Sequence, residues 1–271
     1  MPSGKANKRR RQTTPAPPPV RVRGQKRERK ASPKLLIAVA IAAVAVIVAV
    51  VLGLALDKSS PNAFAGVPAV GTLQGGLPGA SDIEALFKGI PQSGTTLGSS
   101  KAPVTMTEFI DAQCPYCREF ETTVMPSLVK NYVRTGKVRI QMEPWAFIGP
   151  DSTRGQAAEL AAAEQGKAFN FAELLYFNQG EENTGWLDDS MIASTAKSIP
   201  GLRTQALNAA RSSSAVKQAQ QNVDKLALTD KVTGTPTLLV GPTGTKGTEV
   251  ALSSPTDKAA VVAAITHALN S

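Results

Sequence analysis

The only two cysteines of this 271-residue chain stand three positions apart, in the run Cys114-Pro115-Tyr116-Cys117. Two thiols at this spacing can close a small, reversible disulfide, and no other cysteine is present to form a structural bridge with either. Half of a zinc site is the competing interpretation. Structural zinc takes four protein ligands, and the one histidine, His267, stands near the other end of the sequence. We therefore predict a redox-active pair and no metal site.

The pair stands where a predicted strand gives way to a predicted helix. Residues 103–111 are rich in β-branched and apolar side chains, and residues 117–134 have a helical pattern. A helix N-terminus presents unpaired N–H groups and a partial positive charge, which together stabilise a thiolate. We expect Cys114 to be the nucleophile and Cys117, one turn into the helix, to be the more buried resolving thiol. Pro115 suits the first helical turn, where an N–H would have no helical partner.

The remaining pattern completes an α/β domain over residues 90–271. A proline inside the first helix, Pro126, is expected to kink or break it. The following elements are a strand at 137–142, a helical block at about 152–230, a strand at 234–241 that is entered through a proline, a strand at 248–252, and a helix at 255–270. This order predicts a thioredoxin fold with an inserted helical domain at about 152–230.

The segments before this domain differ sharply in composition. Residues 1–34 hold twelve of the 30 Lys and Arg residues and a single acid, so the basic charge of the chain belongs to this tail. Residues 35–56 form a run of 22 uncharged, mostly aliphatic residues, which is long enough for a transmembrane helix. Residues 57–89 form a linker rich in Gly, Pro and Ser, with a flexible or extended tether predicted over 57–80 and a short capped helix over 81–88.

These segments predict a single-pass protein of the cell membrane. The positive-inside rule places the basic tail in the cytoplasm and the domain outside it, where disulfides persist. The apolar run is longer than the usual core of a cleaved signal peptide, so we favour a retained signal anchor. Cleavage near Ala65, where Ala63 and Ala65 form a small-x-small site, is the alternative. A basic tail can also bind nucleic acid, but the adjoining apolar run favours the membrane.

Three stretches together resemble the DsbA-like thiol-disulfide oxidoreductases. They are TEFIDAQCPYC at 107–117, EQGKAFNFAELLYFNQG at 164–180 and VTGTPTLLVG at 232–241. The resemblance is greatest to the membrane-anchored extracytoplasmic members of Gram-positive bacteria, and it covers about residues 90–270. CPYC alone is weakly specific, since glutaredoxins also carry it, whereas the three stretches in this order are specific.

The resemblance implies roles for further residues. Pro236 matches the cis-proline that lies opposite the cysteine pair, and Thr235 before it would offer its backbone to an extended substrate peptide. Glu108 matches the buried carboxylate that assists proton transfer at the buried cysteine. A charged residue at a strand edge is the alternative interpretation of Glu108. Tyr116 stands where strongly oxidising members often have histidine, and a neutral tyrosine brings no charge to the thiolate.

The leading functional hypothesis is an extracytoplasmic dithiol oxidase that passes its disulfide to unfolded secreted or envelope proteins. It would need no cofactor beyond the Cys114–Cys117 disulfide, and a quinone-linked membrane protein of the DsbB or VKOR type would reoxidise it. An extracytoplasmic reductase or isomerase of the same fold is one alternative. A non-catalytic chaperone or scaffold for unfolded secreted proteins is the other.

Overall fold

The structure, a computed structural model, describes residues 63–271. The predicted basic tail at 1–34, the predicted anchor at 35–56 and the first residues of the predicted linker lie outside this range. Within residues 63–271, no helix has the length and apolar character needed to cross a membrane.

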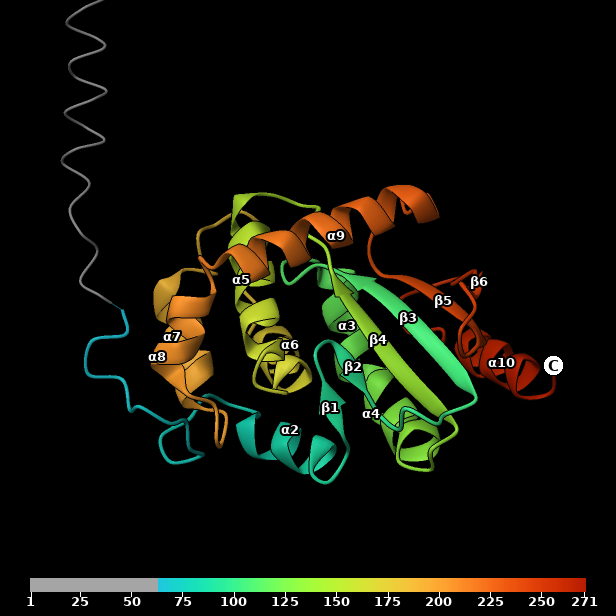
Figure 1. Ribbon diagram of the computed structural model, residues 1–271, viewed down its shortest axis with the longest axis horizontal. Coiled ribbons are helices and arrows are strands. Elements are labelled where there is room, and N and C mark those ends of the chain that lie inside the picture. Colours follow the sequence, from blue (N-terminus) through green and yellow to red (C-terminus); the bar gives the residue numbers. More distant parts are fainter. Residues whose placement is uncertain (1–62) are drawn as a thin grey trace, which may run out of the picture. The chain divides into compact units, whose positions relative to one another are not determined.

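A mixed sheet lies at the centre of the described residues (Figure 1). Its strands run in the order β1-β2-β4-β3-β5-β6. The parallel pair is β3 with β4, and the other neighbouring strands are antiparallel. The bounds are β1 Gln92–Ser93, β2 Thr96–Leu97, β3 Val104–Ile110, β4 Val138–Pro144, β5 Thr237–Pro242 and β6 Thr248–Glu249. The four strands β4-β3-β5-β6 have the order and directions of a thioredoxin fold, with the connection from β3 to β4 made by helices.

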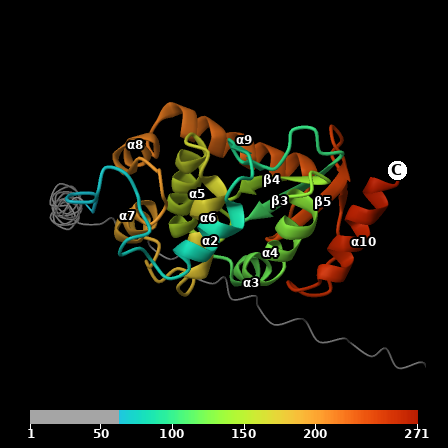
Figure 2. The same cartoon turned by 90° about the horizontal axis from the view of Figure 1, so that it is seen from below.

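Helices cover both faces of this sheet, with α3 and α4 on one side and α9 on the other (Figure 2). Five helices, α5 to α9, stand between β4 and β5 in the chain. The bounds are α2 Ala80–Phe87, α3 Pro115–Thr123, α4 Met125–Leu128, η1 Val129–Val133, α5 Pro150–Ala163, α6 Ala168–Phe177, α7 Asp189–Lys197, α8 Thr204–Ala210, α9 Ser214–Asp230 and α10 Lys258–Leu269.

The alternation of side chains along β3 builds a core on each face. Val104, Met106 and Ile110 point into the larger core, which includes residues of α3 and α10. Phe109 points the other way and packs with Ala227 of α9 in a smaller core. Because successive residues of a strand face opposite sides, every even-numbered residue of β3 faces the layer that contains α3.

The predicted break in the first helix is present. The helix ends at Thr123, and Pro126 lies in the short helix α4, which continues into the π-helical turn η1. Proline lacks the N–H that would continue the hydrogen-bond ladder, so it is accommodated in the first turn of the new helix.

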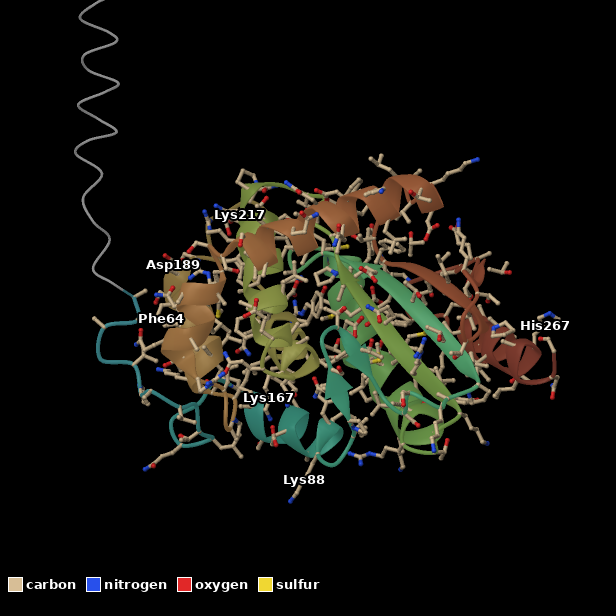
Figure 3. The ribbon with its side chains drawn as sticks, viewed as in Figure 1. Phe64, Lys88, Lys167, Asp189, Lys217 and His267 are labelled. Carbon is tan, nitrogen blue, oxygen red and sulfur yellow. The ribbon has the colours of Figure 1, made fainter. Side chains whose placement is uncertain are left out.

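The linker prediction is wrong for residues 63–89, which pack onto the folded domain. The side chain of Phe64 is only 2% exposed, and it lies beside α7 and α8 (Figure 3). The Gly71 N–H donates a hydrogen bond to the Leu202 carbonyl. Gly71 also lies so close to the turn after α7 that a Cβ atom at this position would clash with the Ile199 carbonyl. Composition alone predicted a flexible segment here, because the few apolar residues that anchor it are widely spaced among Gly, Pro and Ser.

The helix α2 within this segment contributes to the main core. Ala80, Ile83 and Phe87 are buried, and the Phe87 ring makes an edge-to-face contact with Phe169 of α6 at a centroid distance of 6.0 Å. The hairpin of β1 and β2, which the sequence analysis did not predict, extends the sheet beyond β4.

We expect Phe87→Ala to lower the free energy of unfolding by about 3–5 kcal/mol, because it removes a buried ring from a packed core. Leu73→Ala, at a side chain that is 43% exposed in the same segment, should change it by no more than about 0.5 kcal/mol. Urea unfolding of the reduced protein measures both. Equal, small effects of the two substitutions would contradict the packing of this segment.

Candidate active site

Cys114 is the N-cap residue of α3, and its sulfur faces the first turn of the helix. Its backbone is extended, with φ −71° and ψ 119°, and its Sγ accepts a hydrogen bond from the Cys117 N–H at 3.4 Å. Pro115 occupies the start of the helix, as predicted, and Tyr116 is 59% exposed. Both cysteines are free thiols and both are buried, Cys117 completely.

The two thiols differ strongly in acidity. The pKa of Cys114 is lowered to about 6, first because the Cys117 thiol donates a hydrogen bond to its ionised form; the Thr235 side chain and the N–H groups of Cys117 and Tyr116 add to this, against the opposing effect of burial. The pKa of Cys117 is raised, first by complete burial and then by the interaction with Cys114. Both shifts have the directions expected from the sequence, and a pKa of about 6 makes Cys114 the thiolate at neutral pH.

The segment before β5 lies against the cysteine pair. The Thr235–Pro236 peptide bond is cis, as predicted. Cys114 Sγ lies 3.3 Å from the Thr235 carbonyl oxygen, to which it donates a hydrogen bond when the thiol is protonated. These residues are 121 positions apart in the chain. They meet because β3 and β5 are neighbours in the sheet, and the register that pairs Phe109 with Thr237 brings the end of one strand to the start of the other.

Asp111 holds the loop between β3 and α3. Its carboxylate accepts hydrogen bonds from the N–H groups of Gln113, Phe147 and Ile148, each at 2.8 Å, and its carbonyl accepts from the Cys114 N–H. A carboxylate with three backbone donors ties this loop to the one that follows β4. The sequence analysis missed this role, although Asp111 stands directly after the predicted strand.

Gln179, just beyond α6, holds the same loop from the other side. Its side-chain amide donates to the carbonyls of Ala112 and Cys114. The Gln113 side chain in turn donates to Ser152 and accepts from the Asn183 N–H. The helical block between β4 and β5 therefore positions the cysteine pair directly. The sequence signal for this role was Gln179 in the stretch FNQG, which had been noted only for its resemblance to the family.

Glu108 lies in the middle of the sheet, so its interpretation as a residue at a strand edge is wrong. It pairs with Met142 of β4 and Leu238 of β5, and it faces the layer that contains α3. The side chain is 1% exposed, and its pKa is raised well above the usual value, first by burial and then by the charge of Glu121. Burial therefore favours the neutral carboxylic acid form of Glu108.

Three more glutamates that the sequence analysis did not single out are buried nearby. Burial raises the pKa of Glu121 well above its usual value, with further contributions from Glu173 and Glu159. Burial likewise raises the pKa of both Glu159 and Glu173 to about 8. Buried carboxyl groups with raised pKa values are typical of functional sites, and four of them lie near this cysteine pair.

Other titratable groups show no sign of a metal centre. In residues 63–271, no group of three or more His, Cys, Asp or Glu side chains is arranged to hold a metal ion. His267 projects from the exposed side of α10 (Figure 3).

Comparisons with known proteins agree with this geometry. A family model described as Thioredoxin matches residues 92–255. A probable disulfide bond formation protein D of Bacillus cereus is 32% identical over 148 residues, which cover 54% of this chain and 68% of that protein. The disulfide bond formation protein D of Bacillus subtilis is 29% identical over 116 residues, which cover 41% of this chain and 51% of that protein.

Solved structures share the fold. BdbD of Bacillus subtilis, in its oxidised form, superposes with a TM-score of 0.59 and 21% identity, covering 67% of this chain and 97% of BdbD. The alpha-DsbA1 of Wolbachia pipientis gives a TM-score of 0.53 and 18% identity, covering 69% of this chain and 96% of that protein.

We expect the reduced protein to show a thiolate absorbance that titrates with a pKa of about 6, the value set for Cys114 by its hydrogen bonds. Cys117→Ala should raise this pKa, because it removes the Cys117 thiol, whose hydrogen bond lowers the pKa of Cys114 the most. Absorbance at the thiolate band, followed from pH 4 to 10, measures both proteins. Cys114→Ala is the matched control and should leave no thiol that ionises below the usual range. An unchanged pKa in Cys117→Ala would contradict the assignment of the donor.

Proposed function

The chain belongs to the thioredoxin family, among its DsbA-like thiol-disulfide oxidoreductases, and we propose that it introduces disulfides into secreted or cell-envelope proteins. The observation that carries the proposal is the unequal acidity of two adjacent thiols. Cys114 is ionised at neutral pH and Cys117 is protonated and buried. A stabilised thiolate favours the dithiol form over the disulfide, which makes the disulfide an oxidant.

The catalytic cycle begins with the disulfide form. A client thiolate attacks Cys114 Sγ, the bond between the two enzyme sulfurs breaks, and Cys117 leaves and gains a proton. A second client thiolate then attacks the client sulfur of the mixed disulfide and releases Cys114 as a thiolate. The client loses two electrons and gains a disulfide, and the enzyme dithiol gains those two electrons. No cofactor besides the cysteine pair takes part.

The client peptide would bind along the segment that carries Thr235 and Pro236. Both residues are half-buried beside Cys114, and an extended peptide can pair with the backbone there by adding a strand. Two aromatic side chains are exposed near the site: Tyr116 lies between the two cysteines, and Phe147 lies in the loop after β4. They would give an apolar surface to an unfolded client. Glu108 would assist proton transfer at Cys117 from beneath the helix.

The proposed compartment rests on the N-terminal sequence, and the proposed redox partner rests on the resemblance to DsbA-like proteins. The apolar run at 35–56 would anchor the chain in the cell membrane, with the tail at 1–34 in the cytoplasm and the domain outside. The reduced enzyme would pass its electrons to a quinone-linked membrane protein of the DsbB or VKOR type. The names of the Bacillus relatives, disulfide bond formation protein D, favour this direction of electron flow over that of a reductase or isomerase.

The first test is the reduction potential, measured by equilibrium with glutathione. We expect a value between the approximate limits of −270 mV for a thioredoxin-type reductase and −120 mV for the strongest oxidase, nearer the latter. Tyr116 supplies no positive charge to stabilise the Cys114 thiolate, so we expect the reduction potential to stay below the limit of about −120 mV. A potential at or below about −270 mV would assign the protein to the reductases instead.

The second test traps the client. Cys117→Ala should accumulate mixed disulfides between Cys114 and secreted proteins, because the resolving thiol is absent while the nucleophile still reacts. Non-reducing gels of cells that carry the variant would show the adducts, and reductant would remove them. Cys114→Ala is the control and should trap none. Adducts in the Cys114→Ala variant, or in neither, would contradict the assigned roles.

A further inference from the structure

Two rows of buried side chains face each other where α3 packs on α6. Cys117 and Glu121 are four residues apart on α3, and Glu173 and Tyr176 are three apart on α6, so each pair shares one helix face. Helix α3 has its N-terminus at the active site. Helix α6 has its C-terminus there, because Gln179, just beyond its end, donates hydrogen bonds to the cysteine loop. The rows are therefore antiparallel, with Tyr176 near Cys117 and Glu173 near Glu121.

The electrostatic interactions agree with this pairing. Burial comes first among the causes that raise the pKa of Tyr176, and the charge of Cys117 comes second, ahead of Glu159, Glu121 and Asp111. At the other end of the rows, the carboxyl groups of Glu121 and Glu173 share a hydrogen bond, in which the protonated Glu121 donates.

Polar atoms of these side chains are left without partners. Within residues 63–271, the Tyr176 hydroxyl and the Oε1 atoms of Glu121 and Glu173 make no hydrogen bond. Their side chains are almost fully buried, with exposures of 0%, 2% and 5%. A buried polar group without a partner costs about 1–3 kcal/mol, so a row of three requires an explanation other than stability.

The far end of the rows opens to solvent. A pocket of about 220 Å³ lies there, and its volume is enough for several water molecules. Its rim is exposed at Asp82 and Thr122. It is lined by Asp82, Ile83, Leu86, Glu121, Thr122, Pro126, Glu173 and Phe177.

We propose that Tyr176, Glu121 and Glu173 relay a proton between Cys117 and the water of this pocket. The proposal rests on the assigned redox role of the cysteine pair, and it adds a path that does not pass through Glu108. Burial closes every direct route, since Cys117 has no exposed surface and the thiol must gain or lose a proton in each half of the cycle.

The proton steps balance in both directions. When Cys117 attacks a mixed disulfide on Cys114, the new bond joins the two enzyme sulfurs and the partner leaves as a thiolate. Because the Tyr176 hydroxyl has no direct partner in the described part of the chain, each of its two transfers requires a bridging water. Through such waters the Cys117 proton passes to Tyr176 Oη and the Tyr176 proton passes to the Glu121 and Glu173 pair, which releases one proton to the pocket. When a client opens the enzyme disulfide, the same path runs in reverse and protonates the leaving Cys117.

The acidity of Glu173 suits this task. Its pKa is raised to about 8, first by burial and also by the charge of Glu108, while the hydrogen bond from Glu121 opposes the rise. A relay group titrating near neutral pH can both give and accept a proton. The acids that face the row come from several elements, with Glu108 on β3, Glu159 on α5 and Asp82 on α2, and like charges disfavour ionisation of their neighbours.

The test is the reaction of the reduced full-length chain with glutathione disulfide, followed by acid quench and alkylation. This reaction needs no client and proceeds whether the protein is an oxidase or a reductase. Its first step forms the mixed disulfide on Cys114, and its second step closes the enzyme disulfide through Cys117. Only the second step requires the proton of Cys117 to leave, so the first step is an internal control for folding and for the nucleophile.

We expect Tyr176→Phe and Glu173→Gln to slow ring closure by roughly tenfold to a hundredfold at pH 7, in the lower range of general acid–base effects. The wild type should show a ring-closure rate that rises with an apparent pKa near 8 and a solvent deuterium isotope effect, and both should disappear in Glu173→Gln. Mixed-disulfide formation should be unchanged in all variants.

Glu159→Gln is the matched control, because it removes a buried acid of the same pKa that does not line the pocket. It should leave ring closure within about twofold of wild type. Wild-type ring closure in both relay variants, or an equal loss in Glu159→Gln, would overturn the path. If Glu173→Gln does not fold, Glu121→Gln removes the same link and gives the same test. A low reduction potential would overturn the oxidase proposal and leave the relay standing.

Discussion

Cys114 Sγ accepts hydrogen bonds at the N-cap of α3, and the reactivity of the site depends on that position. The donors are the Cys117 thiol and the N–H groups of the first turn, which have no helical partner of their own. The same helix turn buries Cys117 completely, and this burial outweighs the hydrogen bonds to its sulfur and raises its pKa. One turn of helix thus produces a nucleophile and a resolving thiol from two identical side chains.

The rest of the domain serves to hold this turn in place. Asp111 ties the loop before it to the loop after β4, and Gln179 ties it to the helical block. Pairing of β3 with β5 brings Thr235 to the sulfur from the far side. Three parts of the chain that are distant in sequence therefore fix the geometry of a four-residue motif.

The sequence was sufficient for those features that local pattern controls. The β-branched and apolar run at 103–111, the break at Pro126 and the spacing of the cysteines each predicted their element correctly, because each depends on neighbouring residues. The packing of residues 63–89 was mispredicted, because Phe64 and Phe87 are bound by partners more than eighty residues away. No local signal distinguishes an apolar residue in a linker from one that fills a distant core.

The buried acids show the same limit more clearly. Glu121 and Glu173 look like the polar residues of ordinary amphipathic helices, and their burial appears only when α3 and α6 are packed together. Glu108 was identified through its resemblance to a family pattern, and the structure supplied the physical content by placing it on a central strand. Sequence reasoning found the atoms that react, and it missed most of the groups that surround them.

The acids and the nucleophile respond to pH with opposite sign. Glu159 and Glu173 have pKa values raised to about 8, so the stability associated with their neutral forms is complete at acid pH and is lost as the pH rises through 8. Cys114 has a pKa lowered to about 6, so its thiolate stabilises the reduced form at alkaline pH, and this contribution is lost as the pH falls through 6. The acids titrate in both redox forms, whereas the thiolate exists only in the reduced one. Raising the pH from 6 to 8 therefore removes the stability associated with the neutral acids, while the Cys114 thiolate increasingly stabilises the reduced form relative to a dithiol of ordinary pKa.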